Sequence, residues 1–167
     1  MMNNNQLIQY LIDQLQAVQN GKLWVGANYT LKLNQIDEQQ VFTRPLPNLH
    51  SVAEIISHLT LWRTETILKI RTGKGSKTDD CPENWLPNYQ LIAIGWRKIR
   101  SNYEESLVEI IRLLTDKEDR FLQEKYYDTD FKGDYPFAFV LNGMLHHDLY
   151  HLGQLGIIIK LLKANKT

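Results

Sequence analysis

The feature that most constrains the fold of this chain is the spacing of its apolar residues, which is helical along nearly the whole length. One apolar series repeats at intervals of three or four residues and consists of Ile92, Trp96, Ile99, Tyr103, Leu107, Ile110 and Leu114. This spacing places apolar side chains on one face of a helix and is typical of helix bundles. No segment alternates as a half-buried strand does over a useful length. The sequence therefore predicts an all-α protein.

Residues that begin and end helices place the remaining elements. Asn20 and Gly21 interrupt the first apolar stripe. Ser51 and Glu54 have the spacing of a capping box, which predicts the start of a long helix. Pro136 opens the last helix. The predicted helices cover approximately residues 5–19, 22–36, 51–71, 92–114 and 136–163.

Two irregular stretches separate the longer helices. Residues 73–90 are rich in Gly, Ser, Asp and Pro and form a long central crossover, with Trp85 as its buried anchor. Residues 115–136 are partly acidic and rich in tyrosine, and we expect them to be irregular. Four long amphipathic helices with one long crossover predict a four-helix bundle. At 167 residues the chain can form a single domain, residues 1–167, with a substantial core.

Composition narrows the class of protein. The 19 basic and 19 acidic residues cancel, whereas nucleic-acid binders show clustered Lys and Arg, so no nucleic-acid partner is expected. The single cysteine, Cys81, excludes an internal disulfide framework. The first residues lack a basic segment and an apolar run, so we expect no secretory signal. The longest apolar stretch, 155–162, is too short to cross a membrane. We expect a cytoplasmic protein without a membrane partner.

Histidine is the residue type whose placement indicates chemistry. His146, His147 and His151 lie within six residues. At about 100° per residue on a helix, His147 and His151 lie about 40° apart on the apolar face, and His146 points about 140° away from His151. Two buried imidazoles one turn apart can share a metal ion, because neutral imidazole is the commonest protein ligand. The alternative, two core histidines bonded to the backbone or to each other, needs two independent partners.

A third ligand has to come from another helix. His58, in the middle of the 51–71 helix, is the best candidate, whereas His50 lies in the loop before that helix and is a poorer one. Three histidine ligands leave coordination positions open, as in catalytic metal sites. Imidazole ligands favour zinc or nickel as the divalent metal ion and leave manganese or iron as alternatives.

Three further side chains are candidates for the same pocket. Glu54 and Glu65 lie close to the stripe of His58 and could act as general bases or support the ligands. Gln154 lies near the metal face of the last helix and could orient a ligand or a substrate. Two simpler interpretations stay open: the glutamates are solvated, and Gln154 makes an interhelix hydrogen bond.

Two segments resemble motifs of the DinB-like superfamily. The segment from Ser51 to Leu59, followed by Trp62, resembles its second-helix motif. The last-helix motif is matched by His147-Asp148-Leu149-Tyr150-His151-Leu152-Gly153-Gln154-Leu155, where the family often has alanine in place of Leu152. The likeness extends to the Trp24 segment and to Asn84-Trp85. It implies an up-down-down-up four-helix bundle with a metal site built from His58, His147 and His151.

The resemblance also implies a range of functions. The family includes metal-dependent hydrolases and low-molecular-weight thiol S-transferases, and homodimers are common in it. A metal-dependent enzyme of either kind would use the divalent ion to activate water or a thiol, and its partners would be a small-molecule substrate or a thiol. The alternative is a non-catalytic metal-binding or stress-associated helical module. Removal of the metal separates the two, because a structural metal holds the fold together.

Overall fold

A computed structural model describes residues 4–164, so the first three and the last three residues of the predicted domain lie outside it. Its elements follow in the order α1 (Gln6–Gln19), α2 (Tyr29–Leu33), α3 (Val52–Thr72), α4 (Asn88–Ile94), α5 (Trp96–Thr115), the 3-10 helix η1 (Asp119–Gln123), β1 (Lys125–Asp128), β2 (Gly133–Pro136) and α6 (Phe137–Ala164). None of the helices within residues 4–164 combines the length and the apolar character needed to span a membrane.

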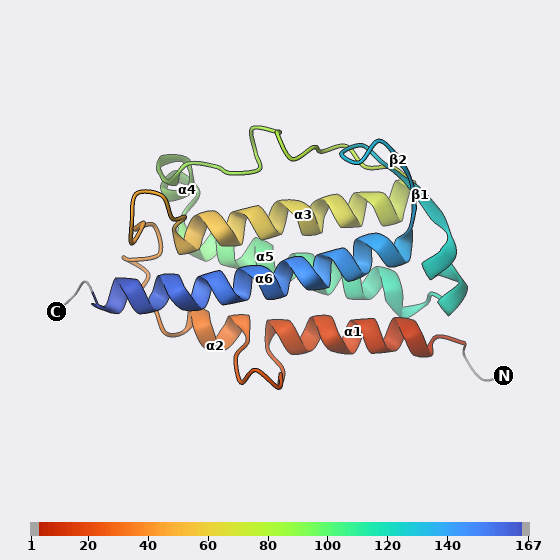
Figure 1. The fold of residues 1–167 in the computed structure, drawn as a ribbon, viewed down its shortest axis with the longest axis horizontal. Helices are drawn as coiled ribbons and strands as arrows, with labels where there is room; N and C mark the ends of the chain where they lie inside the picture. Colours follow the sequence, from red (N-terminus) through yellow and green to blue (C-terminus); the bar gives the residue numbers. More distant parts are fainter. Residues whose placement is uncertain (1–3, 165–167) are drawn as a thin grey trace.

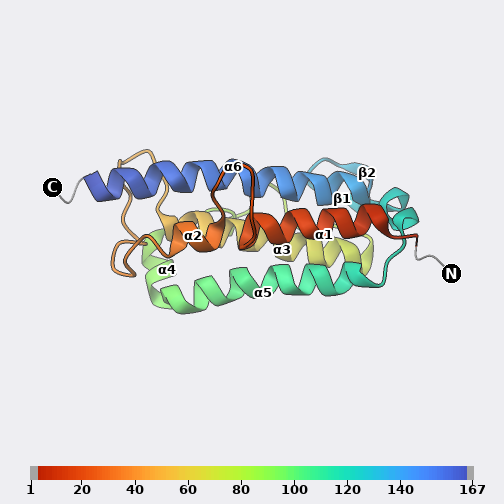
Figure 2. The same cartoon turned by 90° about the horizontal axis from the view of Figure 1, so that it is seen from below.

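In this described range, four long helices lie side by side as a bundle (Figure 1). α1 and α3 each pack against both α5 and α6, and the view from below shows α5 and α6 on opposite sides of that pair (Figure 2). α1 and α6 run one way along the bundle, and α3 and α5 run the other way. Because α3 and α5 are parallel, the chain has to return along the bundle between them, and residues 74–87 make this crossover. The predicted four-helix bundle with a long crossover is confirmed.

α3, which carries His58, begins and ends where the sequence predicts. The Ser51 hydroxyl accepts a hydrogen bond from the Glu54 N–H at 3.1 Å, and the Glu54 carboxylate accepts one from the Ser51 N–H at 2.7 Å, which completes the capping box. Gly73 follows the helix with a φ of 71°, in the left-handed region that favours glycine. These caps determine where α3 begins and ends.

The helix predicted over residues 22–36 is wrong in extent, because only Tyr29–Leu33 is helical there. Gly26 has a φ of 68°, which is incompatible with a continuing right-handed helix. Asn28 is the N-cap of α2, and its side chain accepts a hydrogen bond from the Leu31 N–H at 2.8 Å. A capping asparagine sets the first residue of a helix, so α2 starts later than its apolar pattern suggests.

The apolar series that begins at Ile92 is divided between two helices. Gly95 has a φ of 87° and separates α4 from α5, and Ile92 on α4 is exposed. The rest of the series forms the buried face of α5, as predicted, and consists of Trp96, Ile99, Tyr103, Leu107, Ile110 and Leu114.

The stretch predicted to be irregular, residues 115–136, contains η1 and an antiparallel hairpin in which Tyr126 of β1 pairs with Tyr135 of β2. Each strand has four residues, too few for the alternation of a strand to be recognised in the sequence. The Gly75 N–H donates to the Tyr127 carbonyl at 2.8 Å, and the Tyr127 N–H donates to the Gly73 carbonyl at 2.9 Å. The start of the crossover is therefore attached to this hairpin.

A buried ion pair connects the long helices in the middle of the bundle. The Arg63 guanidinium on α3 donates to the Asp148 carboxylate on α6 at 2.6 Å, and both side chains are fully buried. The guanidinium also donates to the Tyr103 hydroxyl on α5 at 3.0 Å and to the Gln19 side chain on α1 at 3.1 Å. All four long helices thus meet at Arg63. A buried charge is tolerated only when it is paired and hydrogen-bonded, so this network selects one alignment of the helices.

We expect Arg63→Met to lower the free energy of unfolding by about 3–5 kcal/mol, because it leaves the Asp148 carboxylate buried without its counter-ion. Urea denaturation of the metal-free protein, followed by circular dichroism, measures the loss. The exposed pair Arg120–Glu118 supplies the control, since Arg120→Met should cost less than about 1 kcal/mol. Equal losses in the two variants would contradict the role of the buried pair.

Candidate metal centre

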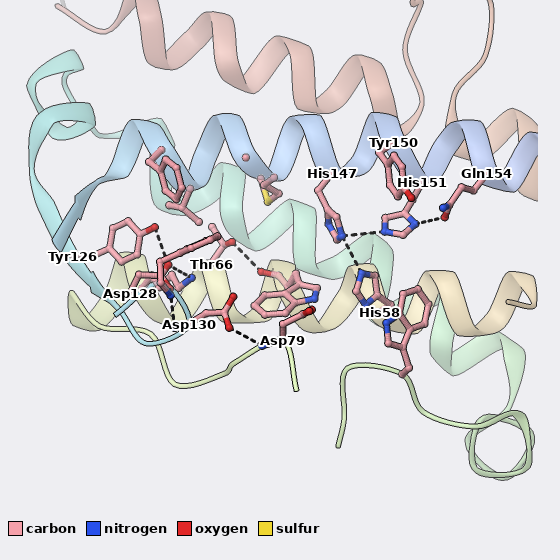
Figure 3. Close-up of a pocket in the computed structure, with 18 of the residues that line it drawn as sticks. His58, Thr66, Asp79, Tyr126, Asp128, Asp130, His147, Tyr150, His151 and Gln154 are labelled. Atoms are coloured by element: carbon pink, nitrogen blue, oxygen red, sulfur yellow. Dashed lines mark hydrogen bonds and ion pairs between the residues drawn. The ribbon is translucent and has the colours of Figure 1, made fainter. Parts of the chain in front are cut away.

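Three histidines from α3 and α6 converge beside the crossover (Figure 3). His147 Nε2 lies 2.9 Å from His58 Nε2 and 3.0 Å from His151 Nε2. The ligand atoms of the three side chains lie within 4.8 Å of one another, a grouping that could hold a metal ion. Two nitrogens that bind one zinc ion at about 2.0–2.1 Å lie roughly 3 Å apart. The structure therefore brings together the three histidines selected from the sequence.

Hydrogen bonds on the far side of two rings decide which nitrogen faces the centre. His58 Nδ1 lies 3.1 Å from the backbone carbonyl oxygen of Asn84, which can only accept, so Nδ1 carries the proton and Nε2 presents its lone pair. Gln154 Oε1 lies 2.7 Å from His151 Nδ1 and also can only accept, so Nδ1 of His151 carries the proton and its Nε2 presents a lone pair. Two lone pairs thus point at His147 Nε2, which can donate at most one proton. Hydrogen bonds alone therefore leave the Nε2 atom of either His58 or His151 without a partner. One cation can accept the lone pairs of all three Nε2 atoms, so the three histidines fit a metal ion.

Burial keeps the three imidazoles neutral. The pKa of His147 is lowered to about 3 and that of His151 to about 4, chiefly by burial and further by neighbouring imidazoles. Burial also lowers the pKa of His58, against the opposing effect of its hydrogen bonds to Asn84. Neutral imidazole is the form that binds metals, so these side chains need lose no proton to bind one at neutral pH.

The centre opens onto a cavity of about 710 Å³ between α3, α6, the crossover and the hairpin (Figure 3). Pockets of about 300–1,000 Å³ are the usual size for small-molecule sites. The aromatic side chains in its wall are Trp62, Trp85, Tyr126, Phe131, Phe139 and Tyr150. Coordination positions left open by the histidines can therefore face a space large enough for a substrate.

The end of the cavity away from the histidines carries polar groups beside its aromatic side chains (Figure 3). Lys69 Nζ donates to Asp128 Oδ2 at 2.8 Å, and the Tyr126 hydroxyl donates to the same oxygen at 3.1 Å. Asp128 Oδ1 accepts hydrogen bonds from the N–H groups of Asp130 and Phe131, which holds the hairpin turn in place. No local sequence pattern indicates these residues as part of a site, because Lys69 and Asp128 are 59 positions apart in the chain.

The other candidates from the sequence take different places. Gln154 lines the cavity and contacts His151, as described above. Glu54 binds Arg44, whose Nε donates to it at 2.9 Å, and caps α3. Glu65 accepts hydrogen bonds from the Ser76 hydroxyl at 2.9 Å and from the Lys77 N–H at 3.1 Å. Both glutamates are buried and not solvated. Neither is among the described residues that line the cavity.

The remaining two histidines lie apart from the three converging nitrogens. His146 is exposed on α6, one position from His147. His50 lines the cavity, but its ring stacks on Trp85 with the ring centroids 3.7 Å apart. Trp85, expected as a buried anchor, is half-buried and packs against a core cluster in the bundle.

Comparison with solved structures places this fold among known ones. The mycothiol-dependent maleylpyruvate isomerase aligns with a TM-score of 0.63 and 13% identity over 93% of this chain and 64% of the isomerase. A DinB-like protein from Bacillus subtilis aligns with a TM-score of 0.58 and 12% identity over 95% of this chain and 93% of that one. YfiT from Bacillus subtilis aligns with a TM-score of 0.56 and 11% identity over 98% of this chain and 87% of YfiT. It is described as a probable metal-dependent hydrolase with an unusual four-helix bundle topology.

These similarities differ in what they show. At 11–13% identity the solved structures show a shared fold alone, and this chain spans less than two thirds of the isomerase. No curated protein sequence matches the chain significantly. The family model of the DinB superfamily matches residues 25–155, which is well over half of the chain and includes all three converging histidines. The chain therefore belongs to the DinB superfamily.

Proposed function

We propose that this protein is a metal-dependent enzyme in which His58, His147 and His151 hold a divalent cation. The observation that carries the proposal is the convergence of three neutral Nε2 atoms on the wall of a cavity. When bound there, a divalent cation supplies Lewis acidity that lowers the pKa of a water or a thiol at an open coordination position. Zinc or nickel suits an all-imidazole set best, with manganese or iron as alternatives. From the family resemblance we also propose a single domain that assembles as a homodimer.

The residues around the ligands orient them and shape the space for the substrate. The Asn84 carbonyl and the Gln154 side chain hold His58 and His151 in the tautomers that leave Nε2 for the metal. The aromatic side chains next to the histidines offer apolar contact beside the centre, and the Lys69–Asp128 end offers hydrogen bonds to polar groups. This cavity suits a small-molecule substrate that reaches from one end to the other.

Hydrolysis and thiol transfer require the same ligands and differ in the nucleophile. A thiol is supported as a partner because one structural neighbour is a mycothiol-dependent isomerase. Water is supported because another is described as a probable metal-dependent hydrolase. We therefore propose a low-molecular-weight thiol or water as the species that the centre activates.

A non-catalytic metal-binding or stress-associated module is the second candidate, with the metal kept for structure. The apolar core favours the enzyme, because each of its two hydrophobic clusters joins side chains from all four long helices and can hold the bundle together without a metal. The Arg63–Asp148 pair also joins α3 to α6 without any contribution from a metal.

Single substitutions of the ligands test the centre. We expect His58→Ala, His147→Ala and His151→Ala each to abolish stoichiometric metal, because two imidazoles bind a divalent ion much more weakly than three. Elemental analysis of protein purified without chelator or nickel resin measures the metal content. The exposed neighbour gives the matched control, since His146→Ala should retain the metal. Full retention in His58→Ala would remove that residue from the centre.

Removal of the metal separates the enzyme from the structural module. The chelator-treated protein should keep its helical circular dichroism and a cooperative thermal transition, because apolar side chains from all four long helices pack together without the metal. A small structural metal domain would instead unfold, since metal binding supplies its folding energy. Unfolding on chelation would favour the structural module.

Activity tests the catalytic proposal directly. The metal-loaded protein should consume a low-molecular-weight thiol in the presence of an electrophile, or hydrolyse an activated ester or amide, and chelation should abolish the reaction. His147→Ala should be inactive and His146→Ala active in the same assay. Equal rates in these two variants would show that the reaction does not use the centre.

A further inference from the structure

A stack of three rings lies beside the metal centre and includes His50, to which the proposed function gives no role, and Trp85, which it uses only as part of the cavity wall. The Trp85 indole lies between the imidazoles of His50 and His58, with ring centroids 3.7 Å and 3.9 Å apart. The ring planes differ by 8° and 6°, so both contacts are face to face. One face of a candidate metal ligand is therefore covered by an indole, and the other face of that indole is covered by a second imidazole.

Two adjacent residues of the crossover set the orientation of His58. The Asn84 carbonyl oxygen accepts a hydrogen bond from Nδ1, which fixes the tautomer and the edge of the ring that faces the centre. Trp85 covers one face and limits rotation of the ring plane. Asn84 is itself held, because its Oδ1 accepts from Trp62 Nε1 at 2.9 Å and its Nδ2 donates to the Asp79 carboxylate at 2.9 Å.

The outer ring of the stack lies beside the start of α3. His50 Nδ1 is 3.7 Å from Glu54 Oε2, which is too long for a hydrogen bond. Glu54 is held in turn by Arg44 and by the N–H of Ser51. Because His50 covers the outer face of the indole, Trp85 cannot move away from His58 without displacing His50.

We propose that Trp85 is a positioning residue of the metal centre, which holds His58 Nε2 toward the other two ligands and stabilises the metal-bound form of this imidazole. A cation on Nε2 draws electron density out of the imidazole ring. An electron-poor ring stacks more favourably on the electron-rich face of an indole, as cations do. The contact becomes stronger when metal binds and so raises the affinity. This inference rests on the proposed metal site.

Two substitutions of Trp85 separate aromatic stacking from simple filling of space. Trp85→Phe keeps an aromatic face, and Trp85→Leu keeps apolar bulk without one. We expect Trp85→Leu to lower the affinity of the full chain for Zn²⁺ about tenfold, the lower end of the effect of residues that support metal ligands. Trp85→Phe should stay within a factor of about three of the wild type. Competition with a chromophoric chelator measures both affinities.

The visible spectrum of bound Co²⁺ gives a second measurement, because its bands report the geometry of the ligands. The wild type and Trp85→Phe should share band positions, and Trp85→Leu should shift them. A role in packing alone would lower the thermal stability of the metal-free protein without changing this spectrum. Trp24, which is fully exposed, supplies the control, and Trp24→Leu should change neither affinity nor spectrum.

The possible failures are distinguishable. If Trp85→Leu binds Zn²⁺ as tightly as the wild type and shows the same Co²⁺ spectrum, the positioning role of Trp85 is overturned and the proposed metal site stands. If the wild-type protein binds neither Zn²⁺ nor Co²⁺, both proposals are overturned.

Discussion

The ion pair between Arg63 and Asp148 is the contact on which the arrangement of the helices depends. Two opposite charges in the interior are stable only when they meet with good geometry, so the pair admits one alignment of α3 against α6. Asp148 directly follows His147, and Arg63 lies five residues after His58 on the neighbouring helix. The alignment that satisfies the charges also brings His58 to the turn of α6 that carries His147 and His151. The Tyr29 hydroxyl donates to the backbone carbonyl of Asp148 at 2.7 Å and holds this part of α6 in place.

The centre combines neutral ligands with fixed orientations. Burial keeps the imidazoles uncharged, and the groups behind them, the Asn84 carbonyl and the Gln154 amide, select the tautomers. Metal centres depend on such supporting contacts, because a ligand that is already oriented loses less freedom when the metal binds. The crossover closes one side of the cavity, and it also carries Asn84 and Trp85, which orient His58.

Periodicity and caps predicted the long helices well. Ser51, Glu54 and Gly73 mark the ends of α3 through local hydrogen bonds and backbone sterics, which depend on neighbours in the sequence. The predictions failed where a single residue interrupts a continuing apolar pattern, as Gly95 does between α4 and α5. They also failed at the hairpin, whose four-residue strands are stabilised by pairing with each other and with the start of the crossover.

By itself, the sequence determined that His147 and His151 share the buried face of one helix, because helical geometry relates residues four apart. It also identified His58 as a candidate, with support from the family resemblance. Only the tertiary structure decided how the three nitrogens meet, which tautomers they hold, that Glu54 and Glu65 bind elsewhere, and that Trp85 stacks on His58. These contacts join residues far apart in the chain, and they form only after packing and the buried ion pair have aligned the helices.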